Sequence, residues 1–504
     1  MTLLPSFVRV VQGWHNCFSD YRTHRRAMGF ALALLVTLGR RTISRAICAQ
    51  QRQYQSWASD YRFFSTSCWN PRQLFDVARQ EACRLMWDRQ PLVVAMDDTI
   101  LRKTGTRIPW ARTLRDPLSP RFNTNLTWAL RFLHAALLIW PPQAKGAARA
   151  IPIAFELAPP VAKPKRPRHR KDDSIQKRQY DRAQYAKAMQ EYRRKQKEEG
   201  LSAQGARLLA DLHSRFSTDP GWRQQKLWAV VDASFCNRTV FNQLAAGIIL
   251  IGRTRKDIRL YAPPQKQDRK GKGRNRKYGK PLPTPEQLRQ DASVPWQHQS
   301  IFAAGKKHSL HYKTLAPVLW KIGSGARPMR LIVIRPLSYR AHGHTLYRRP
   351  AYLLISDPEV DVAQALQAYF YRWEIEVDQK EEKDLLGVGQ AQVWSQGAVP
   401  RQPAFHVASY AALLVAALKV YGMNTVVASE PLPLWRRNKP PRRLSAALLI
   451  AQLRAELDEC QTGLTTKTHH LRHRKNQFRP DALQEQIGMK IPVTLRAIVR
   501  NAWS

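Results

Sequence analysis

Two apolar runs of strand length, each followed directly by aspartate, constrain the fold of this chain most. Pro91–Met96 precedes Asp97 and Asp98, and Leu227–Val231 precedes Asp232. Short apolar runs of this kind predict strands that are buried on both faces. Carboxylates that follow such strands can converge at one edge of a sheet. We therefore expect an α/β fold with acidic side chains gathered at that edge.

Ordinary structural roles for these aspartates stay open. Asp232 precedes residues 233–244, a plausible helix, so its side chain could simply cap that helix. Asp98 could likewise cap a turn through Thr99. The order of the acidic positions along the chain favours a functional interpretation, because a third one follows on a predicted helix.

The third acidic position lies in a helix-like stretch at residues 369–383. At about 100° per residue, Tyr369, Arg372, Glu376 and Lys383 fall within about a 60° stripe on one side of a helix. A single carboxylate beside a guanidinium, an ammonium and a phenol suits the binding of phosphates next to a metal-binding acid. Glu376 could also be one half of an ordinary i,i+4 pair with Arg372. Together, the three acidic positions predict a site for two divalent cations, roughly 3.5–4 Å apart.

The charge of the chain points to its partner. Its 504 residues include 83 Lys and Arg against 37 Asp and Glu, a formal net charge of +46. Nucleic acid best explains such an excess, because each neutralised phosphate releases counterions. An acidic membrane surface is the competing interpretation. The apolar runs Met28–Leu38 and Val407–Leu418 are too short to span a bilayer, so we predict no membrane association.

The cysteines indicate the compartment. Six are scattered along the chain without a Cys-x-x-Cys pair. This pattern argues against a disulfide framework or a zinc ribbon and fits a reducing environment. We therefore predict an intracellular protein of the cytosol.

The motifs resemble those of a known enzyme family. The Tyr369-Arg372-Glu376-Lys383 spacing resembles the signature of DDE transposases of the IS4 superfamily, which includes Tn5-type and IS701-like elements. Residues 96–99, Met-Asp-Asp-Thr, resemble their first catalytic motif. Residues 231–232 with the apolar run 249–253 resemble the second, in which an Asp opens a helix and a strand ends in Arg. The resemblance covers roughly residues 90–425.

The resemblance implies a fold and a set of site residues. The fold would be α/β, an RNase H-like catalytic core interrupted by a mostly β insertion domain, with helical N- and C-terminal domains. The carboxylates would bind Mg²⁺, which Mn²⁺ can replace, and the other side chains would contact DNA near the scissile phosphate. An Asp-x-Thr pattern selects Asp97 and a Tn5-like register selects Asp98, so both remain candidates. The candidate catalytic and metal-binding residues are Asp97, Asp98, Asp232 and Glu376, and the candidate DNA contacts in the core are Tyr369, Arg372, Lys383 and Arg253.

Five regions follow from these assignments. They are a helical N-terminal DNA-binding domain at 1–88, a first part of the core at 89–254 with a basic insertion at 160–200, a mostly β insertion domain at 255–349, a second part of the core at 350–425, and a helical C-terminal region at 426–504. In the first region, helix Met28–Leu38, a turn at Gly39 and a short helix from Thr42 to Cys48 fit a helix-turn-helix as well as a plain helical bundle. Arg45 on the short helix is therefore a candidate DNA contact. The basic insertion reads equally as a DNA-contacting arm or as a disordered solubilising loop.

These features together predict a cut-and-paste DNA transposase of an insertion sequence. It would hydrolyse a phosphodiester at the terminal inverted repeats of the element and join the freed 3′-hydroxyl to target DNA, as a homodimer in a synaptic complex. One alternative is an RNase H-fold DNA nuclease that cuts without transposition. The other is a catalytically inactive DNA-binding derivative, although such a protein would gain nothing from acidic side chains that face phosphates.

Overall fold

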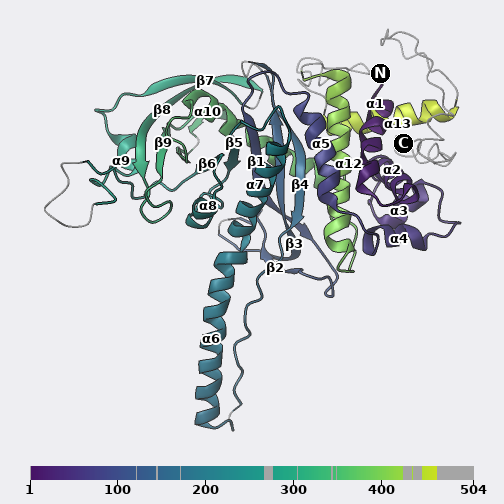
Figure 1. Ribbon diagram of the computed structural model, residues 1–504, viewed down its shortest axis with the longest axis horizontal. Helices are drawn as coiled ribbons and strands as arrows, with labels where there is room; N and C mark the ends of the chain where they lie inside the picture. Colours follow the sequence, from purple (N-terminus) through teal and green to yellow (C-terminus); the bar gives the residue numbers. More distant parts are fainter. Residues whose placement is uncertain are drawn as a thin grey trace.

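The computed structural model describes residues 2–462 except 118, 121, 143–145, 171, 266–275, 304, 342–343, 348, 424–433 and 435–444. Figure 1 shows a sheet that curves strongly at one end, a bundle of helices beside its other end, and one long helix projecting away from the body. The sheet has ten strands of mixed direction. The α/β class expected from the sequence is confirmed. Most of the predicted C-terminal region, including everything after residue 462, lies outside the described residues.

Five strands form the part of the sheet that carries the acidic residues. In spatial order they are β4 (Arg149–Leu157), β3 (Leu126–Ile139), β1 (Leu92–Arg102), β5 (Leu227–Val231) and β6 (Ile248–Arg253). β3 is antiparallel to both β1 and β4, whereas β5 is parallel to β1 and to β6. A short strand, β2 (Arg112–Arg115), pairs with the outer end of β3.

The first strand differs from the sequence prediction. β1 does not end before Asp97 but continues through Asp97 and Asp98 to Arg102. The reason is the length of its neighbours: the ladder with β5 stops at the pair Met96–Val231, while the ladder with the 14-residue β3 continues to Arg102. The prediction of a strand end was therefore wrong for Asp97 and Asp98, and correct for Asp232.

The sheet continues on the other side of β6. There β12 (Ala351–Ile355) is antiparallel to β6 and is followed by β9 (Pro328–Ile334), β8 (Lys306–Leu319) and β7 (Gln297–Ala303). A separate hairpin consists of β10 (Ser338–Ala341) and β11 (His344–Tyr347), and the short helix α9 (Pro285–Gln290) lies nearby on β9. The segment 255–349 is thus rich in β structure as expected, but its long strands extend the main sheet through β12.

Helices cover both faces of the acidic part of the sheet. On one face, side chains of α5 (Pro71–Cys83), α7 (Leu201–Thr218) and α12 (Ala398–Tyr421) share a core with Val94 and Met96 of β1. On the other face, α10 (Val362–Tyr371) and α11 (Trp373–Asp384) share a core with Val93 and Ala95. The alternation of strand side chains between two faces produces these two cores.

The N-terminal helices pack around α12. They are α1 (Leu3–Gln12), the 3₁₀ turn η1 (Gly13–Cys17), α2 (Tyr21–Val36), α3 (Ile43–Ala49) and α4 (Ala58–Ser65), joined from the far end of the chain by α13 (Ala446–Thr462). The predicted turn at Gly39 has a φ of +68°, and Thr42 caps α3 by accepting from the Arg45 backbone N–H at 3.2 Å. Sequence reasoning underestimated α12. With 24 residues it is long and apolar enough to cross a membrane, yet 78% of its apolar 18-residue stretch is buried inside the protein.

Two further helices complete the core region. The short α8 (Arg238–Gln243) follows β5, and the 25-residue α6 (Ile175–Glu199) precedes α7. α6 is the helix that projects from the body in Figure 1, and none of its residues is buried.

Candidate active site

The register of the sheet brings Asp97 and Asp232 together. Met96 and Val231 are the last paired residues of the parallel ladder between β1 and β5, so the residues that follow them emerge side by side. Asp97 continues in β1, and Asp232 begins the loop after β5. The convergence that the sequence predicted is thus present for these two acids.

Asp97 and Asp98 differ in the face that they occupy. Neighbouring residues of a strand point to opposite sides. Asp97 shares the face of Val93 and Ala95, on which α10 and α11 pack, and Asp98 shares the face of Val94 and Met96. Asp97 therefore faces the helix that carries Glu376.

The stretch that was predicted as one helix is two helices that meet at Arg372. α10 ends at Tyr371 and α11 begins at Trp373, although Arg372 itself keeps a right-handed helical backbone with φ −50° and ψ −33°. Because the backbone stays helical at Arg372, Arg372 and Glu376 remain neighbours, as the helical spacing predicted. Arg372 Nη2 donates to Glu376 Oε1 at 2.8 Å, and Arg372 Nη1 lies 3.8 Å from Asp97 Oδ2. One guanidinium thus connects the carboxylates of a helix and a strand.

Burial and mutual repulsion perturb Asp97. Burial, followed by the nearby charge of Asp232, raises the pKa of Asp97 to about 7. The Asp98 backbone N–H, which donates to Asp97 Oδ1 at 2.8 Å, and the guanidinium of Arg372 only partly oppose this increase. Two carboxylates held in such proximity share a surplus of negative charge that a cation would relieve.

Asp98 is paired with a positively charged side chain of its own, Arg131. Arg131 Nε on β3 lies 3.4 Å from Asp98 Oδ2. Burial raises the pKa of Asp98, while Arg131 and Lys383 counteract the increase. Burial also lowers the pKa of Lys383, which interacts electrostatically with Asp97. Lys383 therefore lies close to both aspartates, as its place in the predicted stripe requires.

Tyr369 and Arg253 lie on the side of Asp232. Burial raises the pKa of the Tyr369 hydroxyl, and the charges of Arg372, Arg253 and Asp232 act on the same group. Arg253 is exposed at the end of β6, where its Nη2 donates to Pro350 O at 3.5 Å. The predicted phenol and arginine thus flank the acidic pair.

The segment after Asp232 is a turn, so the expectation that this Asp opens a helix was wrong. Asp232 Oδ1 accepts from the backbone N–H and the hydroxyl of Ser234, at 2.8 and 2.6 Å. The helix α8 begins only at Arg238, because Asn237 supplies its N-cap by accepting from Thr239 and Val240. The turn leaves Asp232 at the sheet edge beside β1.

Arg45 is not part of this group. Its side chain is exposed on α3, and its Nη1 donates to Leu38 O at 3.2 Å across the turn that contains Gly39. Figure 1 places α3 among the N-terminal helices, on the far side of α12 from β5 and β6. Any contact of Arg45 with DNA would belong to a separate surface.

Sequence reasoning missed a buried polar group beside Asp97 on the neighbouring strand β3. His134 pairs with Asp97 in the ladder between β1 and β3, and His134 Nε2 lies 3.5 Å from Glu382 Oε1 of α11. Burial lowers the pKa of His134 to about 3 and raises the pKa of Glu382. The signal in the sequence was a histidine within the otherwise apolar strand pattern of residues 132–139. Its partner depends on how α11 packs, which local spacing does not give.

Two of these acidic side chains suit a divalent cation as they stand. Asp97 and Asp232 offer hard carboxylate oxygens whose repulsion a cation would relieve, so they fit. Glu376 has the right chemistry but is hydrogen-bonded to Arg372. Across the described ranges, no three His, Cys, Asp or Glu side chains are close enough to hold a metal ion as they stand. For Glu376 to become a ligand, its hydrogen bond with Arg372 would have to break.

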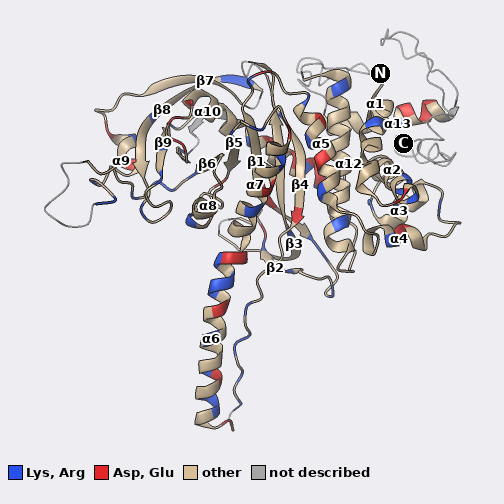
Figure 2. Cartoon of the chain, viewed as in Figure 1, with Lys and Arg blue, Asp and Glu red and all other residues tan. Residues whose placement is uncertain are grey.

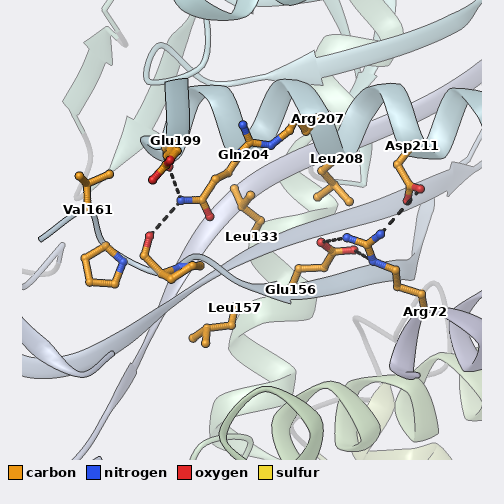
Figure 3. A pocket seen from close by; sticks show the side chains of 12 residues that line it. Arg72, Leu133, Glu156, Leu157, Val161, Glu199, Gln204, Arg207, Leu208 and Asp211 are labelled. Carbon is orange, nitrogen blue, oxygen red and sulfur yellow. Dashed lines mark hydrogen bonds and ion pairs between the residues drawn. The ribbon is translucent and has the colours of Figure 1, made fainter. Parts of the chain in front are cut away.

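A cavity between α7 and β4 lies away from these acids. It has a volume of about 550 Å³ and is lined by residues of α5, β4 and α7. Figure 3 shows Arg72 inside it between Glu156 and Asp211, with N–O distances of 2.7 and 3.8 Å. Arg207 also lines the cavity and donates to Glu198 O, and none of the predicted site residues is among the lining residues.

A comparison with protein families supports the same assignment. A model of the family described as DDE superfamily endonuclease matches residues 14–324. That range contains Asp97, Asp98 and Asp232 but ends before Glu376. No curated protein matches the chain. Because the matched range is more than half of the 504 residues, the chain belongs to the DDE superfamily of endonucleases.

Proposed function

We propose that this endonuclease is a DNA transposase that cuts the ends of a mobile element and joins them to target DNA. One observation carries the proposal: Asp97 and Asp232 lie side by side at the end of the β1–β5 ladder, and Arg372 links Asp97 to Glu376. The three acids come from β1, from the loop after β5 and from α11, and this arrangement supports the predicted catalytic set. The spacing of Tyr369 and Lys383 around them favours the IS4 superfamily.

The strand order supports an RNase H-like core. Three antiparallel strands, β4, β3 and β1, are followed by the parallel strands β5 and β6. The first acid lies inside β1, the second follows β5, and the third arrives on a helix after the strands contributed by 255–349. Those strands would be the insertion in this core.

Asp97 and Asp232 would hold Mg²⁺ or Mn²⁺, with Glu376 as the third ligand. Two such cations supply a lowered pKa for the attacking water or 3′-hydroxyl and stabilise the leaving oxygen. Asp97 is the better candidate than Asp98, because it faces Arg372 and Glu376 whereas Asp98 is paired with Arg131.

Arg372 has the position to couple DNA binding to the release of Glu376. Its Nη1 is buried, and among the described residues no acceptor forms a hydrogen bond with that atom. A DNA phosphate is a stronger, bidentate acceptor for a guanidinium than a single carboxylate oxygen. An arriving phosphate would therefore compete with Glu376 for Arg372 and free the carboxylate. Lys383 and Tyr369 would position the same strand from either side.

The proposed substrate and assembly follow from this role. The partner is double-stranded DNA, first the terminal inverted repeats and then the target, which agrees with the net charge of +46. Paired cleavage of two ends requires two active sites, so the protein would act as a homodimer in a synaptic complex. The place of action would be the bacterial cytosol or nucleoid.

The test is cleavage of a labelled duplex that carries the sequences flanking the gene, with Mg²⁺ or Mn²⁺. Glu376→Ala should abolish cleavage, and Glu374→Ala on the same helix is the matched control that should retain it. Metal-dependent nicking at the element boundary together with joined products would establish transposition. Nicking without joined products would identify a nuclease, and binding without nicking an inactive derivative.

A further inference from the structure

The arm formed by residues 161–199 projects from the body, and within the described structure no residue of its helix α6 is buried. It consists of an extended limb, residues 161–170, and α6. At 1.5 Å per residue, the 25 residues of α6 span about 37 Å. A helix that is polar all round must be explained by what it contacts, because it buries no apolar face of its own.

The arm is fixed firmly at its root. Gln204 Nε2 on α7 donates to Pro159 O at 3.0 Å and to Glu199 O at 2.7 Å, which ties both ends of the arm together. Arg207 Nη1 donates to Glu198 O at 2.6 Å. Figure 3 shows Gln204 making these bonds at the mouth of the cavity between α7 and β4.

The limb and the helix are also joined along the arm. Arg178 Nη2 donates to Arg170 O at 2.9 Å, and His169 Nδ1 lies 3.7 Å from Asp181 Oδ2. The half-buried side of α6 faces this limb, and it includes Tyr185. The arm is therefore a defined structural element, which favours the first of the two interpretations of the basic insertion.

The charges on α6 are sorted by face. Taking Arg193 as 0° and about 100° per residue, the arc from about −20° to 120° contains basic residues, Gln, Ala and one Ile, but no acid. We call this arc the outer face; its basic residues are Arg182, Lys187, Arg193, Arg194 and Lys197. The acids of the helix all fall outside it, at Asp181, Glu191, Glu198 and Glu199.

The basic residues of the outer face have no ion-pair partner in the described structure, although the charge of Glu191 acts on Lys187 and Arg194. All five are exposed, and within the described chain none forms an ion pair. In contrast, Lys177 and Lys195 on the other side pair with Asp173 and Glu191, at 2.6 and 3.0 Å. Over residues 161–199, 14 Lys and Arg stand against 6 Asp and Glu. Figure 2 shows Lys and Arg distributed along the helix and the limb.

The root of the arm lies beside the acidic site. Asn237 Nδ2, in the turn after Asp232, donates to Ser202 Oγ in the first turn of α7 at 2.9 Å. Phe235 of the same turn packs on Gly205. The arm therefore begins about one helical turn from the loop that carries the second acid.

The chemistry of the outer face selects its partner. A second copy of the helix would need an apolar seam at a and d positions, which this face lacks, and would bring like charges together. A membrane-binding helix would need large apolar side chains opposite its basic residues. Exposed Lys and Arg without ion pairs, among short or neutral side chains, suit a polyphosphate backbone.

We propose that the arm binds the phosphate backbone of duplex DNA beside the cleaved bond, over about one helical turn. The proposal rests on the proposed function, because that function places DNA at Asp97 and Asp232. The length of α6 is close to the 34–36 Å of one turn of B-DNA. The contact reads no bases, so it contributes affinity that depends on salt and not on sequence.

The test measures binding of the full-length protein to a labelled duplex of about 60 base pairs over a salt series in EDTA. The variant carries Arg182→Gln, Lys187→Gln, Arg193→Gln, Arg194→Gln and Lys197→Gln together. The matched control carries Arg182→Lys, Arg193→Lys and Arg194→Lys, which keeps every charge. Circular dichroism checks that both remain folded.

Each lost phosphate contact should reduce the slope of log K against log salt by about 0.9, so five contacts amount to about 4–5. The hydroxyl-radical footprint should shorten by about one turn, roughly 10 base pairs, on one side only. The control should keep the slope and the footprint. An unchanged slope in the Gln variant, or a loss of the dimer in light scattering, would overturn the proposal.

The two proposals fail differently. A wild-type protein that binds duplex DNA with the expected slope but never cleaves it would contradict the proposed function and leave the arm supported. A wild-type protein that cleaves with the same footprint as the Gln variant would contradict the arm alone. No binding of any duplex would overturn the role of the arm.

Discussion

Replacing Asp97 by asparagine should stabilise the metal-free protein. The folded protein raises the pKa of Asp97 from 3.8 to about 7, through burial and the charge of Asp232. A carboxyl group whose folded pKa is raised favours the folded state fully below about pH 3.8, and this contribution is lost as the pH rises through about 7. About three pKa units at 1.36 kcal/mol each correspond to about 4 kcal/mol at pH 8.

The amide avoids this cost. Asp97→Asn is neutral at every pH, and its Oδ1 can still accept from the Asp98 backbone N–H. We expect the free energy of unfolding at pH 8 to increase by about 2–4 kcal/mol. At pH 4 the difference between variant and wild type should almost vanish. DNA cleavage should be lost, so stability and activity would change in opposite directions.

The assay is urea unfolding in EDTA at pH 4 and pH 8, with the exposed Asp88→Asn as a matched control that should change nothing. Added Mg²⁺ should stabilise the wild type by about 2.7 kcal/mol at a hundred times its Kd, and Asp97→Asn by much less. A variant that is no more stable than wild type at pH 8 would refute the electrostatic reasoning. A larger gain in the free energy of unfolding from Asp98→Asn would show that the main electrostatic cost lies at Asp98 and not at Asp97.

Three further changes test other parts of the structure. Arg372→Ala should slow single-turnover cleavage about 10²–10³-fold by removing a cation from the reacting phosphate, and an unchanged rate would exclude that role. Burial lowers the pKa of His406 to about 3. The neutral imidazole therefore stabilises the fold fully above about pH 6.5, and this contribution is lost as the pH falls. Between pH 8 and pH 5 the free energy of unfolding in urea should decrease by about 2 kcal/mol more for the wild type than for His406→Leu. Equal losses would show that His406 is not neutral in the fold. Gly205→Val should cost about 1–3 kcal/mol and slow cleavage, because even a Cβ at this position would lie 2.8 Å from Phe235 Cε1, three residues after Asp232; unchanged unfolding and cleavage would show that the turn can move freely.

Local sequence patterns predicted the local features of the site well. The strand at Leu227–Val231 was predicted with its observed bounds. An apolar run of five residues between polar segments is too short for a buried helix and therefore indicates a buried strand. The i,i+4 relation of Arg372 and Glu376 was also correct, since it depends only on helical spacing. The break at Arg372 did not disturb it.

Features that depend on distant parts of the chain were not predictable. The continuation of β1 through Asp97 results from the length of β3, which lies some 30 residues later in the chain. The approach of Glu382 to His134 requires a helix from the second half of the core to dock on that strand. The extension of the sheet through β12 similarly joins segments about 100 residues apart, at Arg253 and Leu353.

The same non-local geometry accounts for the chemistry of the acids. Had β1 ended with β5, Asp97 would stand on a loop and could turn away from Asp232. Because β3 holds β1 in the sheet beyond that point, Asp97 is fixed in a buried position beside the second acid, and burial, followed by the charge of Asp232, raises its pKa. Arg372 lies close enough to reduce this repulsion but remains occupied by Glu376. Under the proposed function, Asp97 and Asp232 are already in place, and a phosphate that binds Arg372 would release Glu376 to complete the site.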